Sequence, residues 1–416
     1  MKPLHVIFLF SLILRLSFVF IGYHGDLNNQ ISWGIEVYEN GILNFYERDS
    51  WQYSAPNQPP LTILMLGGLV FLWNFFKDTF WYLNNSFGFF PSTIIWFWED
   101  KGMVLLMKLP SIIADIAIGA IIYKYLIFKN FSRRKALLIC FVWLLNPVIW
   151  YNSSVWGQTD SVVNLLGILS VFTLLQKRIT IAFLFYTLSV LFKGSLLYFA
   201  PVLFIVAIFQ KHKIFYWLRA LFVCAFVVLL TCVWFYPKID VFIWFLRIYT
   251  QRFIPGEIGY LSANAFNFWW IVDSGETLDS ITYFGLPARI WGFVIPVWAV
   301  IYFMYKLKND FSDKKLFSAL AVISFTVFLF MTRIHERYLY PFFPYATLLL
   351  AFIPKIWILY FLVSAVHLLN LYHLFWSPSL PFLENVLSNY HFKLILSFAN
   401  ILLYVFVFKS VTKQKV

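Results

Sequence analysis

Apolar runs recur along the whole chain, separated by polar stretches that are mostly short. The first is "LHVIFLFSLILRLSFVFIGY", the last is "FKLILSFANILLYVFVF", and many similar runs lie between them. Of the 416 residues, 61% are hydrophobic and 12% are charged, about half the charge of a soluble domain. No long polar segment is present to cover such a core in water. The sequence therefore predicts an all-α polytopic membrane protein.

The distribution of charge predicts how the spans are oriented. Lys and Arg gather in alternate short loops, such as 128–135, 210–213 and 306–315, while most Asp and Glu lie in the other loops. Basic loops face the cytoplasm, and both basic termini should face it too. Two cytoplasmic termini require an even number of crossings. We expect about fourteen spans if the weak segment Phe80–Trp98 is one of them. Thirteen spans are possible. In the alternative, the segment Pro60–Phe76 re-enters the membrane without crossing it, which also keeps the number of crossings even.

Two long loops, 24–59 and 237–285, lie on the external side of this topology. Both mix aromatic, acidic and amide side chains, which favours amphipathic helices on the membrane surface. Neither is a low-complexity linker, so we expect residues 1–416 to form a single integral-membrane domain. The basic residues are spread over short loops instead of forming one patch, so nucleic acid is not an expected partner.

Polar residues at the external ends of the spans are candidates for a functional site, because ionisable groups near membrane depth are costly. These candidates are Asp26, Gln158, Asp160, Lys193, Arg333, His335, Glu336 and Arg337. Lys108 and Asp115 are seven residues apart, on one face of a helix, and we expect them to form a structural pair. Lys193 either caps a tight helical hairpin or binds phosphate.

The candidates suit the transfer of a sugar from a lipid-linked phosphate. Arg and Lys side chains bind phosphate. A hydroxyl acceptor needs a carboxylate base within hydrogen-bond reach, and inversion places that base opposite the leaving group.

Seven segments, in order, resemble motifs of the C-type glycosyltransferases, which are multispan enzymes that use polyprenyl-phosphate-linked sugars. They are "HGDLNNQISWG", "APNQPPLTILML", "MKLPSIIADIAIG", "NPVIWYNSSVWGQTDS", "LFKGSLLYFAPVL", "LSANAFNFWW" and "HERYLYP". The chain resembles above all the bacterial membrane mannosyltransferases related to the GPI-anchor enzymes. The dolichyl-phosphate-glucose-dependent glucosyltransferases share the layout.

The resemblance implies that Asp26 is the general base and that His335, with Arg333 and Arg337, lies near the donor phosphate. The glucosyltransferases carry an Asp two residues before their "PP" pair, where this chain has Asn57 or Gln58. A second carboxylate role is therefore in doubt there. The related oligosaccharyltransferases hold a divalent metal with a DxD-type motif. This chain has only the lone Asp160 in "GQTD", so we expect neither an obligatory metal nor a cofactor.

The function predicted is inverting transfer of a hexose, with mannose ahead of glucose, to a hydroxyl on a glycan or lipid. The expected place is the external face of a bacterial plasma membrane, where Arg333, His335, Arg337 or Lys193 would hold the donor phosphate. A transporter or flippase for a lipid-linked glycan is the rival interpretation, but we find no internal repeat of the kind such proteins show. A third interpretation is a non-catalytic assembly subunit, which predicts that Asp26 can be replaced without loss of function.

Overall fold

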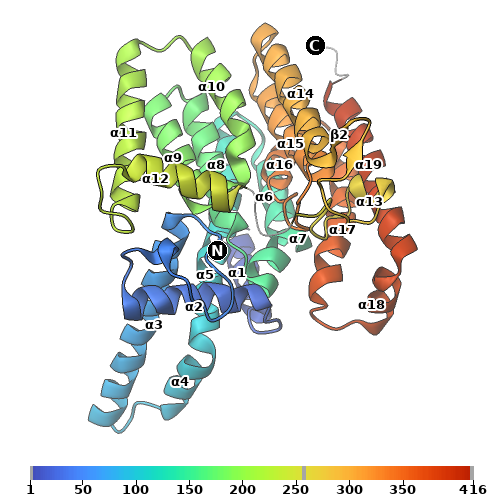
Figure 1. Ribbon diagram of the computed structural model, residues 1–416. Helices are drawn as coiled ribbons and strands as arrows, with labels where there is room; N and C mark the ends of the chain where they lie inside the picture. The colour runs from blue at the N-terminus through green and yellow to red at the C-terminus, as the bar shows by residue number, and fades with distance from the viewer. Residues whose placement is uncertain (1–2, 255–258, 413–416) are drawn as a thin grey trace.

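Residues 3–254 and 259–412 are described by the computed structural model, and they form an almost wholly helical molecule (Figure 1). Residues 413–416, the end of the predicted basic tail, lie outside the described residues. The first ten helices are α1 Pro3–Phe18, α2 Gly25–Asn40, α3 Pro60–Ser86, α4 Ser92–Phe97, α5 Met103–Phe128, α6 Arg133–Leu145, α7 Pro147–Trp150, α8 Asp160–Leu175, α9 Ile179–Phe192 and α10 Ala200–Phe209.

The second half of the chain continues in the same way. Its helices are α11 Ile214–Cys232, α12 Val241–Ile248, α13 Trp269–Val272, α14 Ala288–Asn309, α15 Asp313–Phe330, α16 Phe342–Leu349, α17 Ile356–Phe375, α18 Pro381–Ser388 and α19 Tyr390–Thr412. The strands β1 Thr282–Tyr283 and β2 Leu286–Pro287 form one short antiparallel hairpin.

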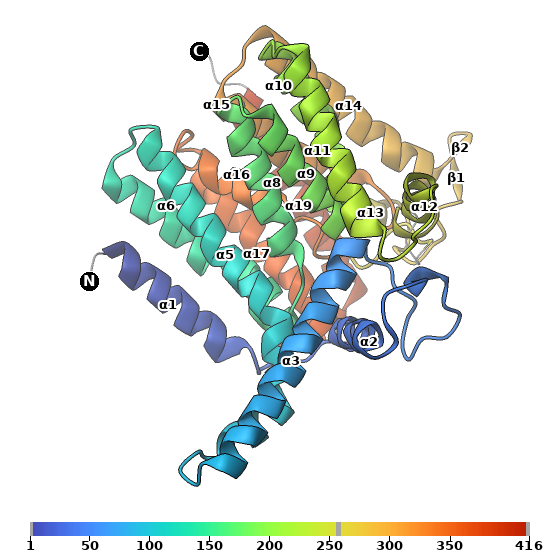
Figure 2. The ribbon, with the colours of Figure 1, turned by 90° about the vertical axis from the view of Figure 1, so that its left-hand side faces the viewer.

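The bundle is organised around α15 and α16, which are buried along almost their whole length. Helices that are apolar on every side belong in the interior of a membrane protein or of a large core. Figure 2 shows α5, α8, α11 and α14 running in the same general direction around this centre. The described residues contain six helices long and apolar enough to cross a membrane, and four shorter apolar helices. The predicted all-α polytopic class is confirmed, whereas the predicted count of fourteen spans is not.

One predicted span is wrong. Phe80–Trp98 is not a separate crossing, because α3 continues unbroken through it as far as Ser86. The chain then turns at residues 87–91, and Pro91 precedes the next helix. From Ser92 to Phe128 the backbone is continuously helical, through α4, a π-helical turn and α5. The apolar character of the segment suggested a span, but its Gly and Pro residues make it the tip of a hairpin.

The span after the first basic loop is broken in two. Pro147 has no N–H to continue α6, and Asn146 Oδ1 accepts the N–H of Val148 at 3.0 Å to begin a new helix. The two halves are bent by 43°. The second half ends in the π-helical turn Tyr151–Trp156 and stops at Gly157, which has a φ of 88°. The break brings residues 156–158 to one end of the bundle.

Both long loops contain the helices that the sequence predicts. In Figure 1, α2 and α12 run across the direction of α10, α11 and α14. One face of α2 is buried through Leu27, Gln30 and Trp33, and the short α12 buries Val241 and Trp244. This spacing is that of an amphipathic helix lying on a bundle.

Candidate active site

Asp26 lies in the first turn of α2, just after the bend that follows α1. The N-cap of this helix is His24, whose Nδ1 accepts the N–H of Asp26 at 3.0 Å. A side-chain acceptor at this position satisfies a backbone donor that the helix itself leaves free. A carboxylate in the first turn is also stabilised by the helix dipole. The sequence order of apolar helix, turn and amphipathic helix thus places Asp26 at the end of the bundle.

Lys108 holds this bend in place. Its Nζ donates to three backbone carbonyls, those of Val19 at 2.7 Å, Gly22 at 2.8 Å and Val155 at 2.8 Å. It therefore ties the end of α1 to the π-helical turn. The expected pair of Lys108 with Asp115 does not form, because Arg15 binds Asp115 instead. Helical spacing put the two side chains on one face, but seven residues of rise, about 10 Å, separate them along the axis.

The carboxylate of Asp26 is held on one oxygen and left open on the other. Oδ2 accepts Gln158 Nε2 at 2.5 Å and Trp156 Nε1 at 3.3 Å. Within residues 3–254 and 259–412, no side chain or backbone group donates to Oδ1. Partial burial raises the pKa of Asp26, but the neighbouring His24 ring and the Arg337 charge lower it by more than burial raises it. The net pKa therefore lies well below the ordinary value, and the carboxylate is ionised. The Asp26 side chain is 33% exposed.

Arg337 is the cation that faces this carboxylate. Its Nη1 lies 4.0 Å from Asp26 Oδ2 and 2.7 Å from Glu336 Oε1. The guanidinium also lies over the rings of Trp156 and Tyr338, at 5.9 and 5.7 Å, a cation–π geometry. Burial lowers the pKa of Arg337, yet the charges of Glu336 and Asp26 raise it more, so its net pKa is above the ordinary value.

Glu336 is a fully buried carboxylate beside Arg337. Burial raises its pKa, but the charge of Arg337 and the nearby ring of His335 bring the pKa down to about 2. Lys193 and Asp160 form a second buried ion pair, with Nζ and Oδ1 at 2.6 Å. The Lys193 ammonium lies 5.3 Å from the centre of the Tyr338 ring. Two ion pairs therefore meet at Tyr338.

A polar cavity opens beside Asp26, with an empty volume of about 420 Å³, part of which is open to solvent. It is lined by Asp26, Asn29, Gln30, Trp33, Asn57, Gln58, Thr62, Gln158, Thr159 and Arg337. Five predicted site residues thus lie together, although α2, the loop before α3, the turn after α7 and the loop after α15 supply them. Sequence reasoning missed Thr62 and Thr159, since a threonine near a helix start gives no sequence signal of its own.

Two buried amide oxygens in this cavity have no partner among the described residues, Gln30 Oε1 and Gln58 Oε1. Buried polar atoms in proteins are normally hydrogen-bonded, so these two oxygens lack the usual partner, which the described chain does not supply. The Nε of Arg337 is likewise buried without a partner in the described chain.

Arg333 and His335 do not line the cavity. Arg333 makes a two-point ion pair with Asp279, with Nε–Oδ2 at 2.6 Å and Nη2–Oδ1 at 3.1 Å. This contact joins the loop after α15 to the second long loop, 237–285. The hydrogen bond to Asp279 raises the pKa of Arg333. His335 pairs through its backbone with Ala263 and Asn264 of the same long loop, and its side chain is 28% exposed.

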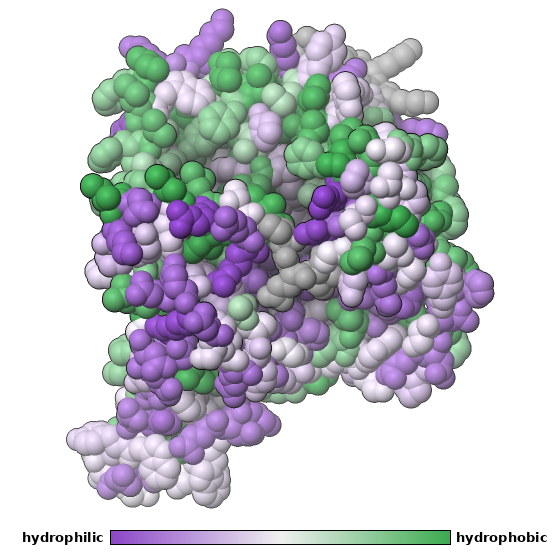
Figure 3. Space-filling model, viewed as in Figure 1, coloured by the Kyte–Doolittle hydropathy of each residue, from purple (hydrophilic) through white to green (hydrophobic). Residues whose placement is uncertain are grey.

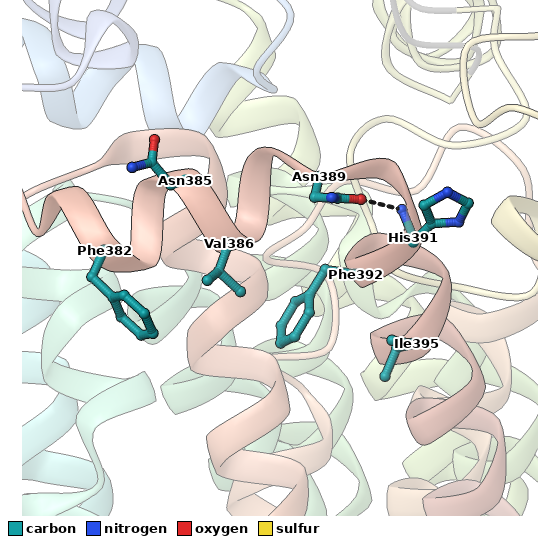
Figure 4. Close-up of a pocket in the computed structure, with 7 residues that line it drawn as sticks. All are labelled: Phe382, Asn385, Val386, Asn389, His391, Phe392 and Ile395. Carbon is teal, nitrogen blue, oxygen red and sulfur yellow. Dashed lines mark hydrogen bonds between the residues drawn. The ribbon is translucent and has the colours of Figure 1, made fainter.

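A second hollow is different in kind. It lies between α18 and α19, and Phe382, Val386, Phe392 and Ile395 point toward a common space there (Figure 4). Its lining is mostly apolar, with the amides Asn385 and Asn389 and one titratable side chain, His391, and it has no carboxylate and no Lys or Arg. Among the residues that the structure describes, no three His, Cys, Asp or Glu side chains are grouped as a metal site requires.

Comparison with known proteins completes the description. No family model matches the chain. It is 27% identical over 192 residues to GPI mannosyltransferase 1 of Saccharomyces cerevisiae, covering 44% of this chain and 39% of that protein. It is 25% identical over 370 residues to the dolichyl pyrophosphate Man9GlcNAc2 alpha-1,3-glucosyltransferase of the same yeast, covering 80% and 63%. A segment of 89 residues is 38% identical to GPI mannosyltransferase 1 of Dictyostelium discoideum, covering 21% of this chain and 20% of that protein.

The chain spans less than two thirds of the length of each of these relatives. They are nevertheless of the two kinds that the sequence motifs indicate, a mannosyltransferase and a glucosyltransferase. The apolar helices make the chain an integral membrane protein. The chain is therefore a helical membrane protein similar to named glycosyltransferases, as its motifs indicate.

Proposed function

We propose that this protein transfers a hexose from a polyprenyl-phosphate-linked donor to a hydroxyl of a glycan or lipid acceptor, with inversion. The observation that carries the proposal is the state of Asp26. Its carboxylate is ionised, lines a polar cavity, and keeps Oδ1 without a hydrogen-bond donor. A general base must reach the proton that it removes, and a free carboxylate oxygen at the cavity wall meets that requirement.

In this mechanism, Asp26 Oδ1 accepts the proton of the acceptor hydroxyl while the hydroxyl oxygen attacks the anomeric carbon. The bond from that carbon to the phosphate oxygen breaks, and polyprenyl phosphate leaves with the bonding electrons. The leaving group is already an anion, so no general acid is needed. Gln158 and Trp156 donate to Oδ2 and so orient the carboxylate.

Arg337 is the first candidate to bind the donor phosphate. It lines the cavity, and its Nε has no partner among the described residues. A guanidinium suits a phosphate because it offers several N–H donors in one plane. Lys193 is a second candidate, at the cost of its ion pair with Asp160. His335 would approach from the loop just before Arg337. Arg333 is engaged by Asp279 and is not required.

The sugar would lie against the amides that line the cavity, where Gln30 and Gln58 have unpartnered oxygen atoms that a rotation of the side chain would turn toward sugar hydroxyls. Mannose is the first choice because three relatives are named as GPI mannosyltransferase 1. Glucose is the second, because the relative matched over 80% of this chain is named as a glucosyltransferase. By the charge pattern of the loops, we place the site at the external face of the membrane, with both termini cytoplasmic.

The test is hexose transfer by the purified, full-length protein from synthetic polyprenyl-phosphate-mannose and -glucose to a panel of glycan and glycolipid acceptors. Replacing Asp26 by Asn should lower turnover by roughly 10²–10⁴-fold, the usual contribution of a general base, at an unchanged unfolding temperature. Asp49→Asn removes an exposed carboxylate from the same loop and should leave turnover unchanged. Full activity of Asp26→Asn would overturn the mechanism. Absence of transfer from both donors, combined with movement of a lipid-linked glycan across vesicles, would favour the flippase.

A further inference from the structure

The far part of α3, together with α4, forms a hairpin arm that leaves the bundle. Helix α3 crosses α2 at two glycines: a Cβ on Gly34 would lie 2.8 Å from the carbonyl oxygen of Leu66, and one on Gly67 would lie 2.5 Å from Val37. Before this crossing, residues 60–70 of α3 are mostly buried, and beyond it the helix is mostly exposed. We call residues 71–101 the arm. In Figure 1 it projects at the lower left, past α2.

The arm is held together by contacts within itself. Trp73 Nε1 donates to the carbonyl of Trp98 at 3.2 Å, and Trp98 Nε1 donates to the carbonyl of Trp73 at 2.9 Å. The ring of Phe80 packs against both Trp98 and Phe90. Near the tip, Asn84 Nδ2 donates to the carbonyl of Phe90 at 2.8 Å. These bonds fix α3 against α4, so the arm is one stiff unit.

The outward faces of the arm carry large aromatic side chains. Phe89 is 84% exposed, Tyr82 67% and Trp96 64%. The other exposed members of the set are Phe71, Leu72, Phe75, Phe76, Trp81, Phe87, Ile94 and Phe97. Eleven large apolar side chains exposed within 31 residues are unusual on a part of a protein that faces water, and exposed apolar surface marks interaction sites. Figure 3 shows the visible face of the arm mostly in pale lavender with some purple side chains, whereas green is more frequent in the upper bundle.

We propose that the arm lies in the lipid interface at the external membrane surface and contacts the bilayer, without crossing it. Trp and Tyr gather at the interface because their rings are apolar while their N–H and O–H groups remain polar. The arm begins at the level of the amphipathic helix α2, and Figure 2 shows α3 running across the direction of α5 and α11. Its exposed side chains point to several sides, as lipid allows, whereas a protein partner would cover one face.

The lengths of the helices agree with this placement. The helix that contains α4 and α5 is continuous over 37 residues, Ser92–Phe128, whereas about 20 residues cross a bilayer. The excess lies at its N-terminal end, in the arm. In this placement α3 leaves the bundle and α4 returns to it on the same side of the membrane. Neither helix is then a crossing, and the predicted number of crossings falls by two and stays even. The cytoplasmic position of both termini is therefore preserved.

The arm is continuous with the wall of the polar cavity. Thr62 lines the cavity, and its Oγ1 donates to the carbonyl of Phe192. The arm begins nine residues further along the same helix, at Phe71. An arm resting at the interface would thus fix the height of the cavity relative to the lipid headgroups. This is the level at which the phosphate of a lipid-linked molecule lies.

The test uses the full-length protein in phosphatidylcholine vesicles without any other protein. Cysteine is placed at Tyr82 or Phe89 in a variant with Cys140, Cys224 and Cys232 replaced by Ala, after confirming that its unfolding temperature is retained. A nitroxide on each cysteine reports collision with oxygen, which partitions into lipid, and with a water-soluble nickel chelate. Matched controls are Asp49→Cys, exposed in an external loop, and Leu221→Cys, 68% exposed on α11.

The oxygen-to-nickel ratio at positions 82 and 89 should be several-fold above that of position 49, and below that of position 221. A membrane-impermeant maleimide should reach position 89 from the same side as position 49, and from the side opposite a cysteine at Arg134. Ratios equal to that of position 49 would place the arm in water and overturn the proposal. Labelling of position 89 from the same side as position 134 would also overturn it, because α3 would then span the bilayer.

Discussion

Asp26 and Asp115 are two carboxylates at opposite extremes of environment in one bundle. Asp115 is fully buried and accepts four hydrogen bonds, two on each oxygen, from Arg15, Ser153, Ser161 and Tyr340. A carboxylate has about four lone-pair sites, so Asp115 has none left. Asp26 accepts donors on Oδ2 alone and lines a cavity. In the sequence, both are acids near apolar runs. The structure distinguishes them, because only Asp26 keeps an oxygen atom that accepts no hydrogen bond from the described residues.

Their cationic partners differ in the same way. Arg15 lies 3.1 Å from Asp115 and also donates to the Leu144 carbonyl at 2.9 Å, which fixes it between helices. Arg337 is 4.0 Å from Asp26, at the limit of an ion pair, and shares its charge with Glu336. We infer that the first pair stabilises the bundle, whereas the second is loose enough for a ligand to enter. The predictions below test that division.

The largest effect is expected from Arg15→Met. It leaves the Asp115 charge buried and without its cation, which typically costs about 3–5 kcal/mol of unfolding free energy. The measurement is chemical unfolding of the purified protein in detergent. The double variant Arg15→Met with Asp115→Leu should recover most of the loss, since an apolar replacement of a whole buried pair is often neutral. If the single variant were as stable as the wild type, Asp115 would not be a structural carboxylate.

The next effect is expected from Arg337→Lys. The substitution keeps a cation beside Glu336 but loses the planar set of N–H donors. Charge-assisted hydrogen bonds contribute about 1.5–3 kcal/mol, so the KM for the polyprenyl-phosphate donor should rise by roughly 10–100-fold at a nearly constant unfolding temperature. Donor titration at saturating acceptor measures it. The matched control is Arg48→Lys, a substitution in the first long loop of an arginine that pairs with Glu36. An unchanged donor KM with a lower kcat would remove Arg337 from phosphate binding.

Much of the fold could be predicted from local patterns. The apolar runs predict spans over Ile179–Phe192 and Ile356–Phe375, and these are the bounds of α9 and α17, because periodicity and helix breakers act locally. The arm could not be predicted, because an aromatic run such as Phe80–Trp98 is apolar enough for a span and equally suited to an interface. Whether such a run forms a span or a hairpin depends on where α3 ends. The hydrogen bonds between Trp73 and Trp98, 25 residues apart, hold α3 and α4 together as a hairpin, and sequence does not reveal such a contact.

The site divides in the same manner. Asp26, Gln158 and Arg337 could be singled out as polar residues at span ends, and the structure brings them together. Lys108 was misassigned because its partners are backbone carbonyls, which sequence does not reveal. Arg333 looks equivalent to Arg337 in "TRIHERYLYP", yet the partner of Arg333 is Asp279, 54 residues away. Which of two neighbouring arginines faces a cavity is a matter of tertiary contacts.

The smallest effect is the most specific to the open carboxylate. Gln158→Leu removes the N–H that donates to Asp26 Oδ2 at 2.5 Å. A donor to the ionised form lowers a carboxyl pKa, so its loss should raise the Asp26 pKa, by about one unit if the bond contributes about 1.4 kcal/mol.

Transfer requires ionised Asp26, hence the acid limb of kcat should move to higher pH in the Gln158→Leu variant. The measurement uses enzyme saturated with donor. The phosphate charge then offsets the charge of Arg337, which moves the acid limb of the wild type and of the variant to a higher, accessible pH. Replacing Gln52, an exposed glutamine of the first long loop, by Leu should leave the acid limb at the wild-type pH. If the acid limb of kcat kept its wild-type pH in the Gln158→Leu variant while kcat fell, Gln158 would be a contact of the substrate and not a positioning residue. The distinction between Asp26 and Asp115 would then depend on the cavity alone.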